Sequence, residues 1–102
     1  MKKYKVVFSG EARKDLEGIY AYVKDVSCEE NATLVINKLA QKINSLDIFP
    51  ERSEPFAKDK HNRPLRVTVS GRYRIVYIVK RREKEVLIVR VFSVSQDAVA
   101  EI

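Results

Sequence analysis

The chain has 102 residues, of which 45% are hydrophobic and 33% are charged, and this composition is typical of one soluble globular domain spanning residues 1–102. Its net charge of +6 favours anionic partners, either nucleic acid or an acidic protein. No apolar run approaches the roughly 20 residues that span a bilayer, and the N-terminus lacks the apolar stretch and cleavage site of a signal peptide. We therefore expect a basic cytoplasmic protein with no membrane association.

The cysteine and histidine content argues against a metal site. The single cysteine, Cys28, excludes an internal disulfide and a cysteine-built metal site, and the single histidine, His61, leaves no histidine cluster. We expect no metal and no cofactor. Cys28 is interpreted as a small residue at a helix start rather than as a reactive thiol.

The first half of the chain predicts one strand followed by two helices. Tyr4–Ser9 reads as a strand, and its last residue is a suitable N-cap for a helix over Glu11–Asp25. Ser27 and Glu30 form a capping-box pattern that opens a second helix, expected to end near Leu46. The break is short, so the helices should form an antiparallel hairpin. Their apolar stripes are Ala12, Leu16, Ile19, Tyr20 and Val23, and Ala32, Val35, Ile36, Leu39, Ile43 and Leu46.

Residues 49–63 predict a loop, because they are rich in charge, contain two prolines and show no periodicity. Lys58, Lys60 and Arg63 lead directly into the next strand and are candidate binding residues for an anionic partner. His61 lies in the same loop, where a solvated histidine is a better interpretation than a general base.

Three consecutive strands are predicted in the second half, over Leu65–Val69, Tyr73–Val79 and Val86–Phe92. The first break falls at Ser70-Gly71. The second falls at residues 80–85, which we interpret as a solvated hairpin end.

Matching the apolar faces of these strands predicts their register. We expect a three-residue turn, Ser70–Arg72, which pairs Val69 with Tyr73 and Val67 with Ile75. The apolar face should then pack on the helical hairpin. Its members are Leu65, Val67, Val69, Tyr73, Ile75, Tyr77, Val79, Leu87, Val89 and Val91, the tyrosines with satisfied hydroxyls.

The opposite face of these strands is predicted to hold three arginines, one from each strand: Arg66, Arg74 and Arg90. No acidic residue falls on the same face, so the three form a candidate anion-binding cluster. A sheet face with mixed apolar and basic surface is usually covered or used.

The predicted order β-α-α-β-β-β gives an α+β fold. Its helical hairpin packs on one face of a four-stranded antiparallel sheet, because neither layer has another partner. The tail, residues 93–102, is expected to extend the last strand or to form one helical turn.

Several motifs follow one another in a fixed order along nearly the whole chain. They are Ser9-x-x-Ala12-x-x-Asp15-Leu16-x-x-Ile19-x-x-Tyr22, then Ala32, Leu46-x-x-x-Pro50, Arg63, Tyr73-Arg74-Ile75-Val76-Tyr77 preceded by Gly71, and Val86-x-Ile88-x-Arg90-Val91. Together they resemble the toxins of the RelE/ParE superfamily, the toxic halves of type II toxin–antitoxin pairs, which include plasmid stabilisation systems.

The resemblance implies a RelE/ParE-like fold and a protein that arrests growth until a cognate antitoxin neutralises it. In such pairs an extended antitoxin segment wraps the toxin and covers its basic groove, giving a toxin–antitoxin hetero-oligomer. RelE-like members cleave mRNA on the ribosome, whereas ParE-like members inhibit DNA gyrase.

The two activities require different residues. In the RNases a basic side chain stabilises charge on the scissile phosphate. Arg74 matches the arginine of the central strand, and Arg66, Arg90 and His61 would assist it only if the chain is a ribonuclease. The superfamily's C-terminal His, Arg or Tyr pattern is missing, because no Tyr, His, Lys or Arg follows Arg90.

The resemblance therefore favours a ParE-like toxin that acts by binding, with gyrase as the target implied by the family. Ribosome-dependent mRNA cleavage is the alternative, and a non-toxic binding module of the same fold is a third possibility. The candidate partner-binding residues are Lys58, Lys60, Arg63, Arg66, Arg74 and Arg90.

Overall fold

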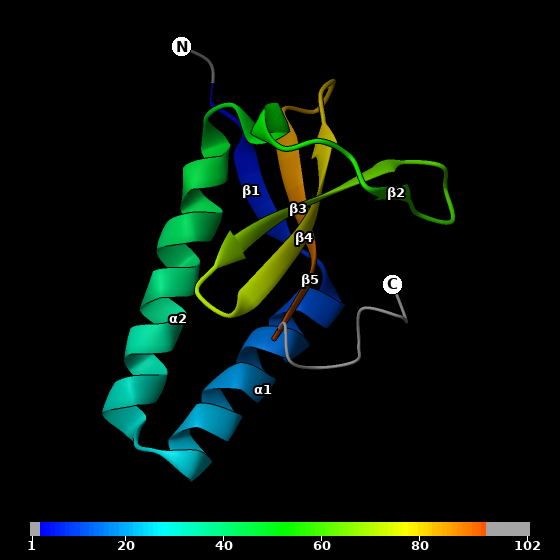
Figure 1. The fold of residues 1–102 in the computed structure, drawn as a ribbon. Coiled ribbons are helices and arrows are strands. Elements are labelled where there is room, and N and C mark those ends of the chain that lie inside the picture. The colour runs from blue at the N-terminus through cyan, green and yellow to red at the C-terminus, as the bar shows by residue number, and fades with distance from the viewer. Residues whose placement is uncertain (1–2, 94–102) are drawn as a thin grey trace.

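The structure is a computed structural model in which residues 3–93 are described, and Figure 1 shows two helices lying against a twisted sheet. The elements in chain order are β1 (Lys5–Phe8), α1 (Gly10–Val26), α2 (Glu29–Asn44), the 3₁₀ helices η1 (Ser45–Asp47) and η2 (Pro50–Arg52), β2 (Ala57–Lys58), β3 (Pro64–Ser70), β4 (Tyr73–Lys80) and β5 (Glu85–Ser93). The tail predicted to extend the last strand or form a helical turn, residues 93–102, lies outside the described residues from residue 94 on. Neither described helix is long and apolar enough to cross a membrane.

The sheet has the strand order β1-β5-β4-β3-β2. The α+β fold with a helical hairpin on one face is confirmed, but the expected four-stranded antiparallel sheet is wrong in two respects. β2 is a fifth strand inside the segment predicted to be a loop. The sequence did not predict it, because a strand of two residues is too short to produce a periodic pattern. β1 pairs in parallel with β5, so the sheet is mixed. Both strands start at the same end, where the Lys5 amide donates to the Lys84 carbonyl at 2.7 Å.

The N-cap prediction holds for α1 and is wrong by one residue for α2. The Ser9 hydroxyl accepts a hydrogen bond from the Ala12 amide at 3.0 Å. Ser27 instead ends α1, and Cys28 takes the extended N-cap conformation of α2 without a side-chain bond. The Ser27 hydroxyl accepts from the Asn31 side chain at 2.5 Å, so it does not cap the backbone.

The predicted register between β3 and β4 is wrong, because their turn has two residues rather than three. Ser70 pairs with Tyr73, and Val67 therefore pairs with Val76. Gly71 makes this turn possible, since it adopts a φ of +60°, which residues with a Cβ avoid. Relative to β4, every side chain of β3 thus lies on the face opposite to the predicted one.

A bulge in β5 changes which side chains of this strand point toward the helices. Tyr77 pairs with Ile88 but its neighbour Val76 pairs with Arg90, which leaves Val89 as an extra residue. The main core between sheet and helices therefore takes Val86 and Ile88 before the bulge and Val91 after it, with Leu87 and Val89 on the other face. The expectation that Leu87 and Val89 join the main core is wrong.

Both faces of the sheet carry apolar residues. The main core holds Ile75 and Tyr77 of β4, as predicted, against Leu39 and Ile43 of α2 and Ala12 of α1. A second cluster on the outer face consists of Leu65, Val76, Ile78 and Phe92, with Val67, Leu87 and Val89 packed against it. The outer face is therefore more apolar than the predicted arginine face.

The Tyr77 hydroxyl connects the sheet to the segment that follows the helices. It donates to the Pro50 carbonyl at 2.7 Å and lies 2.8 Å from the Ser53 hydroxyl. The residue has no exposed surface. The prediction that Tyr77 is a core residue with a satisfied hydroxyl is confirmed.

Replacing Tyr77 with Phe should lower the stability while keeping the fold, because the Pro50 carbonyl loses its donor inside the protein. We expect a loss of about 1–2 kcal/mol, or roughly 5–10 °C in Tm. Thermal unfolding followed by circular dichroism measures this. Tyr20→Phe is the matched control, because that hydroxyl makes only an exposed contact of 3.4 Å with Glu29. Equal Tm values for the two variants would contradict the assignment.

Candidate functional site

The three arginines predicted to form one cluster do not all share a face. Arg74 and Arg90 lie on the outer face as predicted, because Arg74 pairs with Phe92 and Arg90 pairs with Val76. Arg66 pairs with Tyr77 and therefore lies on the helix side of the sheet rather than on the outer face. Its side chain is only 13% exposed, and its guanidinium donates to the carbonyls of Ser53 and Glu51 and lies 3.6 Å from the Glu51 carboxylate. Arg66 thus fastens the segment after η2 to β3. The cause of the error is the two-residue turn, which shifted β3 by one position.

Arg90 lies at the edge of β5, where it binds helix α1. Its Nε donates to Asp15 Oδ2 at 2.8 Å and its Nη2 to Oδ1 at 3.3 Å, while the Val91 amide donates to the same carboxylate at 2.9 Å. The pair lines a cavity of about 430 Å³ between α1 and the end of β5, together with Tyr22 and Arg72. Asp15 is not among the binding residues predicted from the sequence, although the sequence shows a carboxylate beside the apolar stripe of α1.

Arg74 differs from the other two, because it makes no ion pair among the described residues. It lies on the outer face, opposite Val69 of β3 and Phe92 of β5. Its Nε is buried and has no hydrogen-bond partner within residues 3–93. A buried donor without a partner is uncommon and calls for an explanation. A role for Arg74 in contacting a ligand remains a prediction.

The turn between β2 and β3 is organised by Asp59. One carboxylate oxygen accepts from the amides of His61 and Arg63 at 3.0 and 2.8 Å, and the other accepts from Arg63 Nε at 2.8 Å. Partial burial raises the pKa of Asp59, but these hydrogen bonds and the charge of Arg63 together lower the pKa by a larger amount. The pKa of Asp59 is therefore below its ordinary value. Lys58, Lys60 and His61 are exposed on this turn, whereas Arg63 is held in the ion pair.

A basic cleft of about 610 Å³ lies where β3 and β4 meet the β4–β5 turn. We define it by its cationic side chains, Arg63, Arg66, Lys80, Arg81 and Arg82. Glu51 lies at this cleft, accepts from Arg81 Nε at 2.6 Å and raises the pKa of that guanidinium. Residues 10–44 carry five basic and six acidic side chains, whereas residues 45–93 carry twelve basic and six acidic ones. The positive charge is therefore concentrated away from the helical hairpin.

An apolar groove lies between the helical hairpin and the β3–β4 turn. This hairpin groove encloses about 600 Å³. Tyr22, Val26 and Leu34 line it and are 66%, 64% and 57% exposed, while Lys38 and Arg72 provide basic groups at its rim. The sequence contained a signal for this surface, because these three apolar residues fall outside the core-facing stripes. None of the three is among the binding residues predicted from the sequence.

Among residues 3–93, the candidate catalytic residues do not form an acid–base pair. His61 is exposed on the β2–β3 turn, and Arg66 and Arg90 are engaged by backbone or carboxylate groups. Within residues 3–93, no group of three or more His, Cys, Asp and Glu side chains could hold a metal ion.

Solved structures from toxin–antitoxin systems share the fold of this chain. It is similar to a chain from the chromosomal ParDE system of P. aeruginosa, with a TM-score of 0.74 and 16% identity, covering 89% of this chain and 96% of that one. It is also similar to a chain of the RelBE2 toxin–antitoxin complex of Mycobacterium tuberculosis, with a TM-score of 0.68 and 21% identity over 91% and 93%. It is similar as well to a chain of the archaeal RelE–RelB complex of Pyrococcus horikoshii OT3, with a TM-score of 0.61 and 15% identity, covering 92% of this chain and 98% of that one.

The family follows from the sequence match. Residues 6–98 match the family described as the ParE toxin of type II toxin–antitoxin system, parDE. The chain therefore belongs to the ParE toxin family and is a toxin of a type II toxin–antitoxin system. Among curated proteins, none matches it. The resemblance to the RelE/ParE superfamily is confirmed.

Removing the Asp15 carboxylate should weaken the attachment of α1 to β5. In Asp15→Ala, Arg90 and the Val91 amide lose their shared acceptor in a partly buried place, which should cost about 1–3 kcal/mol. Denaturant unfolding measures the difference. Asp25→Ala, at an exposed position in the same helix, should change stability by less than about 0.5 kcal/mol. A similar loss in both variants would argue against the role of the pair.

The β2–β3 turn should depend on pH only in strong acid. Because the pKa of Asp59 is lower in the folded chain than in the unfolded chain, its stabilisation is complete above the unfolded value and is lost as the pH falls through the folded value. The amide NMR signals of His61 and Arg63 should therefore shift with a midpoint below that of an ordinary aspartate. In Asp59→Asn this transition should disappear, and a midpoint at or above the ordinary value would contradict the prediction.

Proposed function

We propose that this ParE-family toxin acts by binding an essential target in the cytoplasm, with DNA gyrase as the candidate, and that its antitoxin neutralises it by occupying the hairpin groove. The observation that carries the second part is the exposure of Tyr22, Val26 and Leu34 in one groove of about 600 Å³. Apolar patches of this kind on small proteins mark sites of interaction with other proteins.

The composition of the groove favours an amphipathic, acidic segment. Fully burying an exposed leucine or valine side chain contributes about 1.5–3 kcal/mol. Leu34 and Val26 are already partly covered, so each contributes at most this amount, and the Tyr22 ring adds further apolar contact. Lys38 and Arg72 at the rim would pair with carboxylates of the partner and fix its orientation. The net charge of +6 supports an acidic partner in the same way.

Family membership and the placement of the arginines support action by binding rather than by cleavage. A general acid or base must lie within hydrogen-bond reach of the reacting group. Arg66 and Arg90 are engaged in contacts that hold the fold together, and His61 lies on an exposed turn. Lys58, Lys60, Arg63 and Arg74 are proposed as contacts for the target or the antitoxin.

A ribosome-dependent mRNA endoribonuclease is the second candidate, and Arg74 supports it. A buried guanidinium nitrogen without a partner in residues 3–93 has capacity to bind a phosphate oxygen. In that case Arg74 would stabilise the charge on the scissile phosphate.

Inducible expression of the chain alone tests the proposal. Growth is followed together with global mapping of mRNA 5′ ends and a DNA-damage reporter. Growth arrest with the damage reporter active and transcripts intact is expected. New mRNA ends at codon positions that are lost in Arg74→Ala would establish the ribonuclease instead, and no arrest would indicate a non-toxic binding module.

Leu34→Asp should weaken antitoxin binding without unfolding the chain, because Leu34 is exposed and the new carboxylate would face an acidic partner. We expect at least about a tenfold increase in Kd, measured by isothermal titration calorimetry with the cognate antitoxin. Asn37→Asp adds the same charge at an exposed position of α2 outside the groove and should leave Kd unchanged. Equal affinities of the wild type and Leu34→Asp would place the antitoxin elsewhere.

A further inference from the structure

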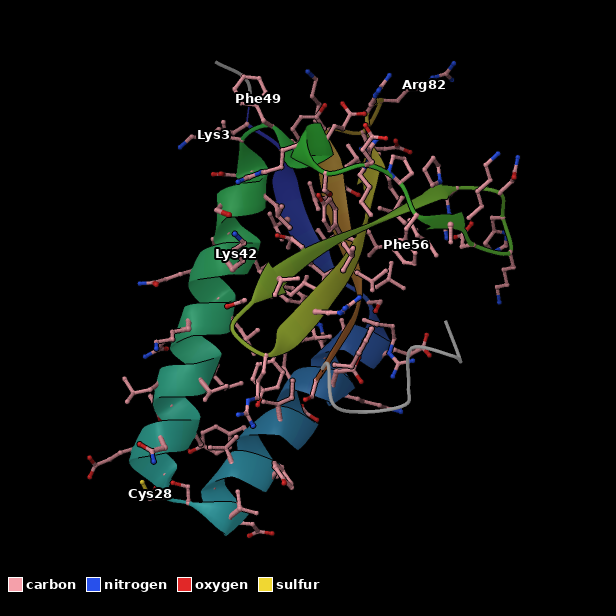
Figure 2. All side chains as sticks on the ribbon, viewed as in Figure 1. Lys3, Cys28, Lys42, Phe49, Phe56 and Arg82 are labelled. Carbon is pink, nitrogen blue, oxygen red and sulfur yellow. The ribbon has the colours of Figure 1, made fainter. Side chains whose placement is uncertain are left out.

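A second hollow lies at the end of the molecule opposite the turn between the helices. It encloses about 600 Å³ around Phe49, with Tyr4, Ile48, Pro50 and Lys84 among its walls. Figure 2 shows Phe49 at the end that also carries Lys3 and Arg82, far from Cys28 at the helix–helix turn. The hollow is therefore separate from the hairpin groove, and it shares Glu51 with the basic cleft.

Two residues around this hollow adopt a left-handed backbone conformation. Phe49 has a φ of 51° and a ψ of 57°, and Lys84 has a φ of 57°. This conformation is unfavourable for residues with a Cβ and is uncommon outside Gly, Asn and Asp. Such residues persist only where the surroundings enforce them, and they gather at functional sites. The one other non-glycine example in residues 3–93 is Asn62, a residue type that tolerates it.

The surroundings hold Phe49 in place through its backbone rather than through its side chain. The Arg52 guanidinium donates to the carbonyls of Ser45, Ile48 and Phe49, with distances of 2.9 Å to Ile48 and 3.2 Å to Phe49. The next residue, Pro50, is buried and accepts from Tyr77. The Phe49 ring nevertheless remains 71% exposed, the largest value for a large apolar side chain in the described part of the chain.

The hollow combines apolar walls with positive charge. Lys84 Nζ lies 5.7 Å from the centre of the Tyr4 ring, and Arg52 adds a second cation. The one carboxylate in the wall, Glu51, is already bound by Arg81 at 2.6 Å. An incoming carboxylate would therefore meet positive charge, and an incoming apolar side chain would meet Phe49, Ile48 and Pro50.

We propose that this hollow is a second docking site for the antitoxin. It would take an acidic segment that places one aromatic or branched apolar side chain against Phe49 and a carboxylate near Lys84. This inference rests on the proposed neutralisation by an antitoxin. A peptide suits the hollow better than single-stranded nucleic acid, because successive bases require several open aromatic faces and the Tyr4 ring is covered by Lys84.

One extended segment of the antitoxin would occupy both the hairpin groove and the Phe49 hollow. The Phe49 hollow lies at the end of the molecule opposite Cys28, and the hairpin groove extends from the turn between the helices to the β3–β4 turn, so the two sites are separated by less than the longest extent of 41 Å. An extended chain covers even this longest extent with roughly 12 residues at about 3.3 Å per residue. Linking two modest contacts in one segment raises the overall affinity above that of either contact alone.

Phe49→Gly separates the proposed binding role from a structural one. Glycine accepts the left-handed conformation without strain, so Tm should stay equal or rise. The Kd for the cognate antitoxin should increase at least about tenfold, measured by isothermal titration calorimetry. Phe56→Gly is the matched control, because it removes another half-exposed ring that is absent from the hollow, and its Kd should equal that of the wild type.

The outcomes distinguish this inference from the proposed function. If the wild type binds the antitoxin, Leu34→Asp weakens binding and Phe49→Gly does not, only the second docking site is overturned. If the wild type does not bind the antitoxin at all, both the proposed neutralisation and the second docking site are overturned. Binding of a fluorescein-labelled oligo(dT) that is lost in Phe49→Gly, with an unchanged antitoxin Kd, would identify a nucleic-acid site and overturn the peptide proposal.

Discussion

The pairing of β3 with β4 determines on which face of the sheet each side chain of β3 lies. A side chain in a strand changes face when the pairing shifts by one residue, and the two-residue turn at Gly71 fixes that pairing. Arg66 and Tyr77 consequently lie side by side on the helix side of the sheet. There, Tyr77 donates to the carbonyl of Pro50 in η2, and Arg66 donates to the carbonyl of Ser53, the residue that follows η2. The same pairing leaves Arg74 on the outer face beside Val69.

Local patterns in the sequence were sufficient for the helices, for most strands and for the centre of the core. Ser9, Ile75 and Tyr77 could be assigned because capping and two-residue periodicity depend on neighbours in the chain. The turn length, the bulge at Val89 and the two-residue strand β2 could not. Each depends on backbone conformations and on long-range pairing that the residue types do not specify.

The site was harder to predict than the fold because a cationic side chain has the same sequence signature whether it binds a ligand or holds the chain together. Arg90 is bound by a carboxylate 75 positions away in the chain, and Arg81 is bound by one 30 positions away. Only the tertiary structure brings these acids to the arginines. The exposed apolar residues of the hairpin groove were visible in the sequence, but their meaning required knowing which helix faces the sheet leaves uncovered.

Helix α1 also closes an edge of the sheet that β1 is too short to cover. Beyond the end of β1, the Ser9 amide and hydroxyl donate to the carbonyls of Ile88 and Val89, and Asp15 accepts from the Val91 amide. These contacts satisfy backbone groups that would otherwise be available to an extended strand from another molecule. Exposed strand edges are common starting points for aggregation. The first turns of α1 thus protect a strand rich in branched apolar residues from pairing with a second copy of the chain.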